Sequence, residues 1–297
     1  MSIKDLGLLT ALGALWGASF IFIRVAAPAL GPFALVEFRV FLAAAALAIY
    51  ALVIGKALKI RHRWKGFLLL GGLNAAIPFT LISAAQLELT ASFGAILNST
   101  TPLFGALVAA VWIGDPLTTR KILGLVLGIL GVAVLVGWSP MPVTLALALA
   151  VSASLTAALF YGIGSVYAKR NFTGIPPLGL AIGQLSGAAA VTMPVAAMDA
   201  PREVPSLVVA ASVLALALLS TAVAYLIYFR LIASVGPTKT LTVTFLVPVF
   251  GVFLGALLLN EPVGGGTLTG LAIILASVFL VNEVRFREGS RKTGGAE

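Results

Sequence analysis

Apolar residues run along this chain in long stretches, separated by short turns that contain glycine, proline or charged residues. Residues 122–168 contain no Asp, Glu, Lys, Arg or His. A helix of a soluble protein is usually apolar along one stripe, whereas about 20 residues that are apolar on all sides can cross a bilayer. Because 122–168 is too long for one crossing, we expect two crossings with a turn at "GWSPMP", residues 137–142.

The same pattern predicts ten membrane-spanning helices. They cover approximately residues 6–27, 33–54, 66–87, 91–113, 120–137, 143–168, 176–198, 205–229, 237–259 and 266–284. The breaks between them carry Gly and Pro, which interrupt helices. The sequence therefore predicts an all-α polytopic membrane protein whose loops are too short to hold a soluble domain.

Composition agrees with this prediction and excludes several kinds of chemistry. The chain is 60% hydrophobic and 10% charged, which leaves too little polar surface to cover a soluble protein of this size. It has no cysteine and a single histidine, His62. Disulfides, thiolate nucleophiles and cysteine metal sites are therefore excluded, and we expect neither a metal nor a cofactor.

The basic residues indicate how the chain is oriented. If the N-terminus is cytoplasmic, sixteen of the nineteen Lys and Arg residues fall on the cytoplasmic side, and only Arg24, Arg39 and Arg202 lie toward the outside. Positive charge prefers the inner side, so both termini are expected in the cytoplasm. The net charge of +9 then serves contact with anionic lipid headgroups and not with nucleic acid.

The chain repeats itself after 146 residues. "PLFGALVAAVWIGDP" (102–116) recurs as "PVFGVFLGALLLNEP" (248–262), and Trp16-Gly17 and Arg24 match Tyr161-Gly162 and Arg170. Each copy holds five predicted helices, and an odd number inserts the second copy upside down. We expect a first repeat at 1–140, a second, inverted repeat at 141–286 and a flexible cytoplasmic tail at 287–297.

Longer segments carry a family resemblance. "LWGASFIFIRVA" and "AAQLELTASFGAILNSTTPLFGALVAAVWIGDPLTTRKILGLVLGILGVAVLV" resemble the EamA family of the drug/metabolite transporter superfamily. The pattern returns in "YLIYFRLIASVGPTKTLTVTFLVPVFGVFLGALLLNEPVGGGTLTGLAIILASVFLV". Asp115 departs from the family, which usually has Glu there.

Within that family the chain is most similar to the YddG-type exporters, which move aromatic and other neutral amino acids and some amphiphilic compounds out of bacteria. The resemblance implies a location in the bacterial inner membrane. It also implies a basket of ten helices around a central cavity, with helices 1, 3, 4, 6, 8 and 9 lining the cavity and helices 5 and 10 at the periphery.

Polar and aromatic residues about ten positions inside the spans are the candidate substrate site. Such a site must replace water around a zwitterion and present apolar or aromatic groups to the rest of the substrate. The candidates are Trp16, Ser19, Phe20, Asn74, Phe79, Ile82, Asn98, Thr101, Tyr161, Gln184, Ser220, Tyr225, Tyr228, Thr244 and Phe245. Amides and hydroxyls offer uncharged hydrogen bonds, and aromatic rings can stack or face a cation. The alternative for each residue is packing or a hydrogen bond to its own backbone.

Prolines and charges inside or beside the spans have structural interpretations as well. Pro78, Pro102 and Pro248 are predicted hinges, because proline removes a backbone donor. Asp115 and Glu261 are expected to cap the helix that follows each of them. Glu37 and Arg39 lie near the outer end of the second helix, where a salt bridge at the rim is expected, so the central pocket is predicted to be neutral.

These patterns favour a secondary transporter that exports neutral, in particular aromatic, amino acids by alternating access. Facilitated uniport fits best, because no carboxylate is expected at the midplane. A metabolite permease for sugars or nucleosides, a passive channel and an intramembrane enzyme remain alternatives, although no catalytic residues appear at depth. Gly124, Gly128 and Gly131 line one face of the fifth helix, and packing within the chain is favoured there over dimerisation, so a monomer is expected.

Overall fold

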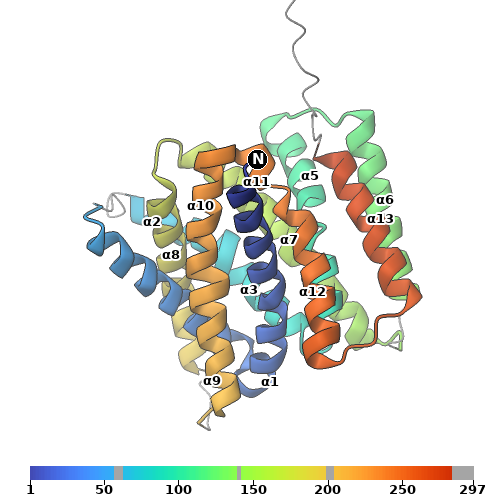
Figure 1. Cartoon of the computed structure of the whole chain (residues 1–297), viewed down its shortest axis with the longest axis horizontal. Coiled ribbons are helices and arrows are strands. Elements are labelled where there is room, and N and C mark those ends of the chain that lie inside the picture. Colours follow the sequence, from blue (N-terminus) through green and yellow to red (C-terminus); the bar gives the residue numbers. More distant parts are fainter. Residues whose placement is uncertain (57–62, 139–141, 199–203, 283–297) are drawn as a thin grey trace, which may run out of the picture.

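The structure is a computed structural model, and it describes residues 1–56, 63–138, 142–198 and 204–282. Within these ranges every regular element is a helix, and the helices run side by side in a bundle (Figure 1). The predicted tail at 287–297 lies outside the described residues. The N-terminus and the end of α13 (Gly265–Val281), the last helix of the described residues, lie at the same end of the bundle.

The helices follow one another with short connections. They are α1 (Ile3–Val53), α2 (Trp64–Gly71), η2 (Gly72–Ala76), α3 (Ile77–Ala85), α4 (Ala91–Asn98), α5 (Thr101–Ile113), α6 (Thr119–Gly137), α7 (Leu145–Asn171), α8 (Pro177–Met198), α9 (Leu207–Leu214), η3 (Ala215–Val223), α10 (Ala224–Val235), α11 (Pro237–Thr240), α12 (Val243–Leu259) and α13 (Gly265–Val281). Seven helical runs are long and apolar enough to cross a membrane, and α12 and α13 are shorter apolar helices. Each of the ten predicted ranges holds a helix, while the inverted relation of the two halves stays a prediction.

The helix α1 covers two of the predicted segments. It bends at Gly31, whose backbone has φ 74° and ψ 159°. A residue with a Cβ rarely adopts a positive φ, and the flanking Pro28 and Pro32 remove two backbone donors, so glycine is well suited to the bend. The predicted break at Gly31-Pro32 is therefore a turn between two helical arms.

Hydroxyl side chains fix where several helices begin. In each case the side-chain oxygen accepts a hydrogen bond from the backbone N–H three residues later, which satisfies one of the free donors of the first turn. The capping residues are Ser2, Thr90, Thr118, Thr144 and Ser206.

Two stretches of π-helix occupy matching places in the two halves. Residues 72–76 (η2) lie between α2 and α3, and residues 215–223 (η3) lie between α9 and α10. A shift of 145 residues carries 72–76 onto 217–221, inside η3. Such wide turns often mark functional sites, because they change the direction in which side chains point. In the first half Pro78 follows the wide turn directly, in the first turn of α3.

Two pairs of glycines bring helices from the two halves into backbone contact. A Cβ built on Gly17 of α1 would lie 2.9 Å from the backbone nitrogen of Gly251 in α12. A Cβ on Gly162 of α7 would lie 3.0 Å from the backbone nitrogen of Gly105 in α5. The sequence repeat matches Gly17 with Gly162 and Gly105 with Gly251. The same kind of helix crossing is therefore present twice.

The predicted proline bends differ between the halves. Pro102 stands in the first turn of α5, after a break at Ser99 and Thr100, and the hydroxyl of Thr101 donates to the carbonyl oxygen of Asn98 at 2.7 Å. That carbonyl would otherwise lack the donor that proline removes. Pro248, by contrast, lies inside the continuous helix α12. The two prolines thus occupy different places in their helices, and movement at either proline stays a prediction.

The helices α6 and α13 pack against each other at one edge of the bundle (Figure 1). The glycine face of α6 is used in this contact: a Cβ on Gly124 would lie 2.9 Å from the carbonyl oxygen of Ser277, and one on Gly131 would lie 3.1 Å from the backbone nitrogen of Ile274. The close approach that these glycines permit thus serves packing within the chain.

Candidate functional site

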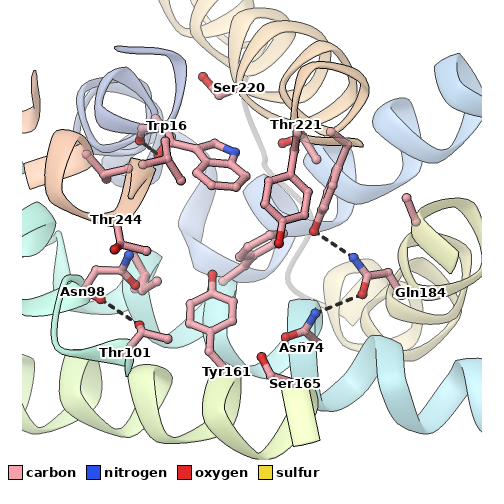
Figure 2. Close-up of a pocket in the computed structure, with 18 of the residues that line it drawn as sticks. Trp16, Asn74, Asn98, Thr101, Tyr161, Ser165, Gln184, Ser220, Thr221 and Thr244 are labelled. Atoms are coloured by element: carbon pink, nitrogen blue, oxygen red, sulfur yellow. Dashed lines mark hydrogen bonds between the residues drawn. The ribbon is translucent and has the colours of Figure 1, made fainter. Parts of the chain in front are cut away.

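A cavity of about 390 Å³ lies in the middle of the bundle. Fourteen of the fifteen predicted residues line it: Trp16, Ser19, Phe20, Asn74, Phe79, Ile82, Asn98, Thr101, Tyr161, Gln184, Ser220, Tyr225, Tyr228 and Thr244. Figure 2 shows Trp16 and Tyr161 reaching into a space that has Asn98 and Thr244 on one side and Asn74 and Gln184 on the other. Both halves of the chain therefore contribute to one cavity of the size that small-molecule sites have.

Phe245 is the predicted residue that does not line this cavity. Its side chain packs against the apolar cluster that includes Phe93, Ile96 and Leu97. The lining residues of this segment are Leu241, Thr244 and Val247 at a spacing of three, together with Val243. Phe245 is one residue past Thr244, about 100° around the helix, so it faces a different neighbour.

A chain of hydrogen bonds fixes the amide side of the cavity. The side-chain amide of Asn74 donates to the carbonyl oxygen of Gln184 at 2.9 Å, and the amide nitrogen of Gln184 donates to the hydroxyl oxygen of Tyr225 at 2.7 Å. Residues from η2, α8 and α10 are thereby held in one orientation (Figure 2). Because the oxygen of Tyr225 already accepts, its own proton is available to a ligand.

Aromatic rings form much of the remaining wall. The ring centroids of Trp16 and Tyr228 are 5.6 Å apart, and those of Phe79 and Tyr161 are 6.2 Å apart. Phe229 adds a further ring, at 5.7 Å from Tyr225. Such spacings are favourable for aromatic pairs, and the same faces can hold a flat apolar ligand.

Arg39 lies in this cavity, which corrects the prediction of a salt bridge at the rim. Its side chain is 7% exposed, its Nε donates to the Thr221 hydroxyl oxygen at 3.1 Å, and its guanidinium carbon lies 3.6 Å from the ring centroid of Phe79. Glu37 instead accepts a hydrogen bond from the hydroxyl of Thr192. Two residues apart on a helix, the two side chains point in different directions, so the carboxylate does not neutralise the guanidinium.

The sequence also missed Ser99, Ser165 and Thr221 among the polar lining residues. Ser165 lies one turn after Tyr161, so helical spacing could have included it. Thr221 is next to Ser220 and on a regular helix would face elsewhere, but it lies in the π-helix η3, where its hydroxyl donates to the carbonyl oxygen of Leu216 five residues earlier. No sequence pattern predicted that wide turn.

Several hydroxyls at the cavity are occupied by their own helices, whereas two polar atoms have no partner. Ser19, Thr101 and Thr244 donate to backbone carbonyls three residues earlier. By contrast, Oδ1 of Asn98 and Oγ of Ser220 are buried and have no hydrogen-bond partner among the residues that the structure describes. Unpaired buried polar atoms are costly, so these two are the natural acceptors and donors for a bound molecule.

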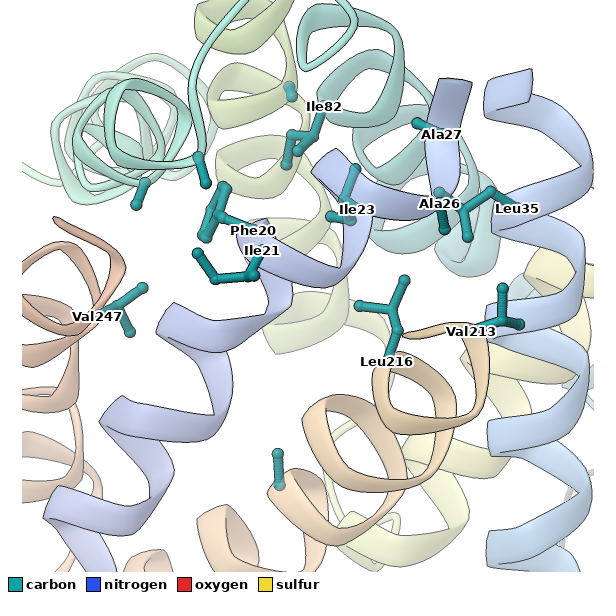
Figure 3. Packing of buried hydrophobic residues seen from close by; sticks show 14 of the residues in the cluster. Phe20, Ile21, Ile23, Ala26, Ala27, Leu35, Ile82, Val213, Leu216 and Val247 are labelled. Atoms are coloured by element: carbon teal, nitrogen blue, oxygen red, sulfur yellow. The ribbon is translucent and has the colours of Figure 1, made fainter. Parts of the chain in front are cut away.

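One end of the cavity is closed by apolar packing. Phe20, Ile23, Ile82 and Val247 line the cavity and belong to a buried cluster that continues to Leu30, next to the bend of α1. Figure 3 shows this packing between α1 and the helices around it. In the other direction the lining continues to Ala168, Phe229 and Leu241. Ala168 and Phe229 are next to Lys169 and Arg230, and Leu241 is two residues from Lys239, so this side of the cavity lies near basic residues.

The turn between α3 and α4 is held at both ends by charged side chains from other segments. Arg24 of α1 donates through Nη1 to the carbonyl oxygens of Gln86 and Leu87, at 2.6 and 2.9 Å. The carboxylate of Glu261 accepts from the backbone N–H groups of Ala91 and Ser92, at 2.6 and 2.9 Å. A cation at a helix C-terminus and an anion at an N-terminus are both favourable, so we call this arrangement the α3–α4 clamp.

The expected local role of the two acid-proline pairs is therefore wrong. Glu261 caps α4 and not the following helix α13, whose N-cap residue is Gly264. Asp115 forms an ion pair with Lys121 at 3.1 Å, and the following helix α6 is capped by Thr118. A shift of 146 residues relates Asp115 to Glu261 and Arg170 to Arg24. In the described part of the chain Asp115 and Arg170 form no such clamp, so the two ends of the bundle differ.

The described residues contain no group of three or more His, Cys, Asp or Glu side chains that could hold a metal ion. The chemistry of the cavity is thus that of hydrogen bonds, aromatic faces and one guanidinium group.

Known proteins resemble this chain over almost all of its length. The EamA-like transporter family matches residues 5–137 and, separately, 148–283. The uncharacterized transporter YvbV of Bacillus subtilis is 27% identical over 93% of this chain and 90% of its own length. The uncharacterized inner membrane transporter YedA of Escherichia coli is 25% identical over 93% and 89%. A solved crystal structure shares the fold with a TM-score of 0.66, 17% identity and coverage of 94% of this chain and 96% of that chain.

Proposed function

This chain belongs to the EamA-like transporter family, and from that premise we propose that it exports neutral, in particular aromatic, amino acids and related amphiphilic compounds across the bacterial inner membrane. The relatives are named as transporters, so transport of small molecules and not catalysis is the activity that membership indicates. The observation that carries the proposal is the central cavity, whose wall combines aromatic rings with a few fixed polar groups.

We further propose that the two halves form an inverted repeat of five helices each and that the protein works by alternating access. The matched π-helices and the two glycine crossings support a common architecture for the halves. The α3–α4 clamp supports two unlike ends, because the matched residues Asp115 and Arg170 do not form it. In this proposal the clamped end is extracellular and the basic end is cytoplasmic, together with both termini.

Counterflow into proteoliposomes tests the function. Vesicles with the purified protein and loaded with unlabelled phenylalanine should accumulate labelled phenylalanine transiently, with saturable rates. A pore would give neither saturation nor counterflow, and an enzyme would change the substrate chemically. Competition with leucine, a hexose and a nucleoside then separates the amino-acid proposal from a sugar or nucleoside permease. Absence of counterflow for every amino acid would contradict the proposed substrate class.

A further inference from the structure

Arg39 is a buried cation without an anionic partner among the described residues. The single ion pair found there joins Lys121 to Asp115, at the surface. Of the residues that line the cavity, Arg39 is the charged one, and the others are uncharged polar, aliphatic or aromatic. A charge inside a membrane-spanning bundle is costly unless it is paired or used, so a group outside the chain is the natural counter-ion.

The guanidinium is held in place with most of its donors free. Only Nε is hydrogen-bonded within the described chain, to Thr221, and the face of the group rests on the ring of Phe79. The Nη groups keep their four N–H bonds for other acceptors. A guanidinium that is fixed by packing can present parallel N–H groups to a carboxylate, which is the geometry that arginine recognises best.

The depth of Arg39 fits contact with a substrate. It lies eight residues after the bend at Gly31, which is about 12 Å along a helix at 1.5 Å per residue. The hydrocarbon layer is about 30 Å thick, so this position is close to its middle when the bend marks the outer end. The hydroxyl proton of Tyr225 is a second donor in the same cavity.

We propose that Arg39 binds the carboxylate of the transported compound, and that an aromatic ring with a carboxylate is sufficient for recognition while the amino group is dispensable. This inference rests on the proposed transport function and narrows its substrate class. The cavity offers a full positive charge to an anion, whereas an ammonium group would meet only ring faces and uncharged oxygens such as Oδ1 of Asn98. The charged contact is therefore the stronger of the two.

Four analogues separate the contributions of the two ends of phenylalanine. Purified protein in detergent is heated with phenylalanine, 3-phenylpropionate, phenylalaninamide or phenethylamine, and the unfolding midpoint is measured over a range of ligand concentrations. The two carboxylates should bind with similar affinity and the amide and amine about 10- to 100-fold more weakly, the range expected for a charge-assisted hydrogen-bonded contact. Equal binding of all four compounds, or binding of none, would overturn the inference.

The variant Arg39→Gln tests the residue. It should weaken binding of both carboxylates about 10- to 100-fold and leave the weak binding of phenylalaninamide unchanged. The control is Arg230→Gln, which removes the same charge from an exposed site on α10 and should change neither the binding of the carboxylates nor that of phenylalaninamide. The ratio of carboxylate to amide affinity is measured within each variant, so it does not depend on the amount of folded protein. An unchanged ratio in Arg39→Gln would refute the role of Arg39.

Two further measurements separate this inference from its alternatives. Replacing isethionate by chloride at constant ionic strength should not stabilise the protein; if chloride does so as well as 3-phenylpropionate, the site is one for inorganic anions and the inference fails. Counterflow with labelled phenylalanine is then measured for Arg39→Gln. If the variant transports phenylalanine and its amide as the wild type does, the carboxylate assignment falls while the transport function stands.

Discussion

Individual side chains at the cavity differ in whether their hydrogen bonds are already used. Gln184 is paired at both ends of its amide, so its role is to orient Asn74 and Tyr225. Ser19 and Thr244 donate to their own helices. Asn98, by contrast, keeps Oδ1 unpaired, and Trp16 offers a ring face beside Tyr228. Asn98 and Trp16 therefore belong to the part of the wall that a ligand can still contact.

Trp16→Ala should therefore weaken transport of aromatic compounds more than that of aliphatic ones. Loss of a favourable ring contact of about 0.5–1.5 kcal/mol predicts a rise of about 2- to 10-fold in KM for phenylalanine, with little change for leucine. Counterflow at a series of substrate concentrations measures both values. Trp112→Ala is the matched control, because Trp112 lies on α5, is 39% exposed and does not line the cavity. Equal losses for both substrates would argue against ring stacking at Trp16.

Sequence reasoning could identify most of these residues, because polarity and depth within a predicted span are enough to select candidates. It failed for Arg39, because the residue is close to the outer end of its predicted helix and was therefore assigned to the rim. Arg39 is placed in the cavity by the bend at Gly31 and by its contacts with Phe79 and Thr221. Both contact partners are far from Arg39 in sequence. Phe245 was selected by its depth within a span, but depth alone does not define which face of the helix a side chain occupies.

At the scale of helices, contacts between the halves depend on positions that carry no side chain. Gly162 of α7 meets the backbone of Gly105 in α5, and Gly17 of α1 meets that of Gly251 in α12. The repeat in the sequence marks these four glycines as equivalent but does not say which helices they join. The same limit explains the α3–α4 clamp: capping rules relate neighbours along the chain, whereas Glu261 caps a helix about 170 residues away.

The glycine pair in α5 and α7 gives an unusually direct test of this packing. A Cβ on Gly162 would lie 3.0 Å from two backbone atoms of α5, whereas one on Gly105 would meet no heavy atom within 4 Å outside its own helix. Gly162→Ala should lower the free energy of unfolding by about 1–3 kcal/mol, since backbone must move to admit the methyl group. Gly105→Ala should have no effect or raise it by up to about 1 kcal/mol through helix propensity.

Thermal or denaturant unfolding in detergent measures both variants under the same conditions. A stable Gly162→Ala protein beside an unstable Gly105→Ala protein would show that the α5–α7 contact differs from the one described.

For the whole molecule, the important property is the difference between its two ends. At one end, packing around Phe20 and Ile82 closes the cavity, and the α3–α4 clamp holds the turn between α3 and α4. At the other end, Asp115 is paired with Lys121. The repeat predicted two similar halves, and it could not predict which conformation the molecule adopts, because both ends have the residues for a clamp.

Breaking the clamp should open the closed end. The chain has no cysteine, so Ser165→Cys introduces a single thiol into the cavity wall. In intact cells a membrane-impermeant thiol reagent should label this cysteine slowly, and the added change Glu261→Ala should raise the rate several-fold, because α4 loses three charge-assisted hydrogen bonds, two from backbone N–H groups and one from the Ser92 hydroxyl.

The control is Glu88→Ala at the same end, because the carboxylate of Glu88 is exposed and forms no hydrogen bond or ion pair within the described residues. If the cysteine is labelled at the same rate with and without Glu261→Ala, in protein of equal abundance, the α3–α4 clamp does not keep this end closed.

The pairing of α6 with α13 also bears on how the chain is made. These helices end the two halves, so α6 leaves the ribosome long before its partner exists. Until α13 is made, the face of α6 that carries Gly124 and Gly131 lacks the helix that covers it in the finished protein. A chain that stops short of Gly265 would therefore leave this glycine face of α6 uncovered.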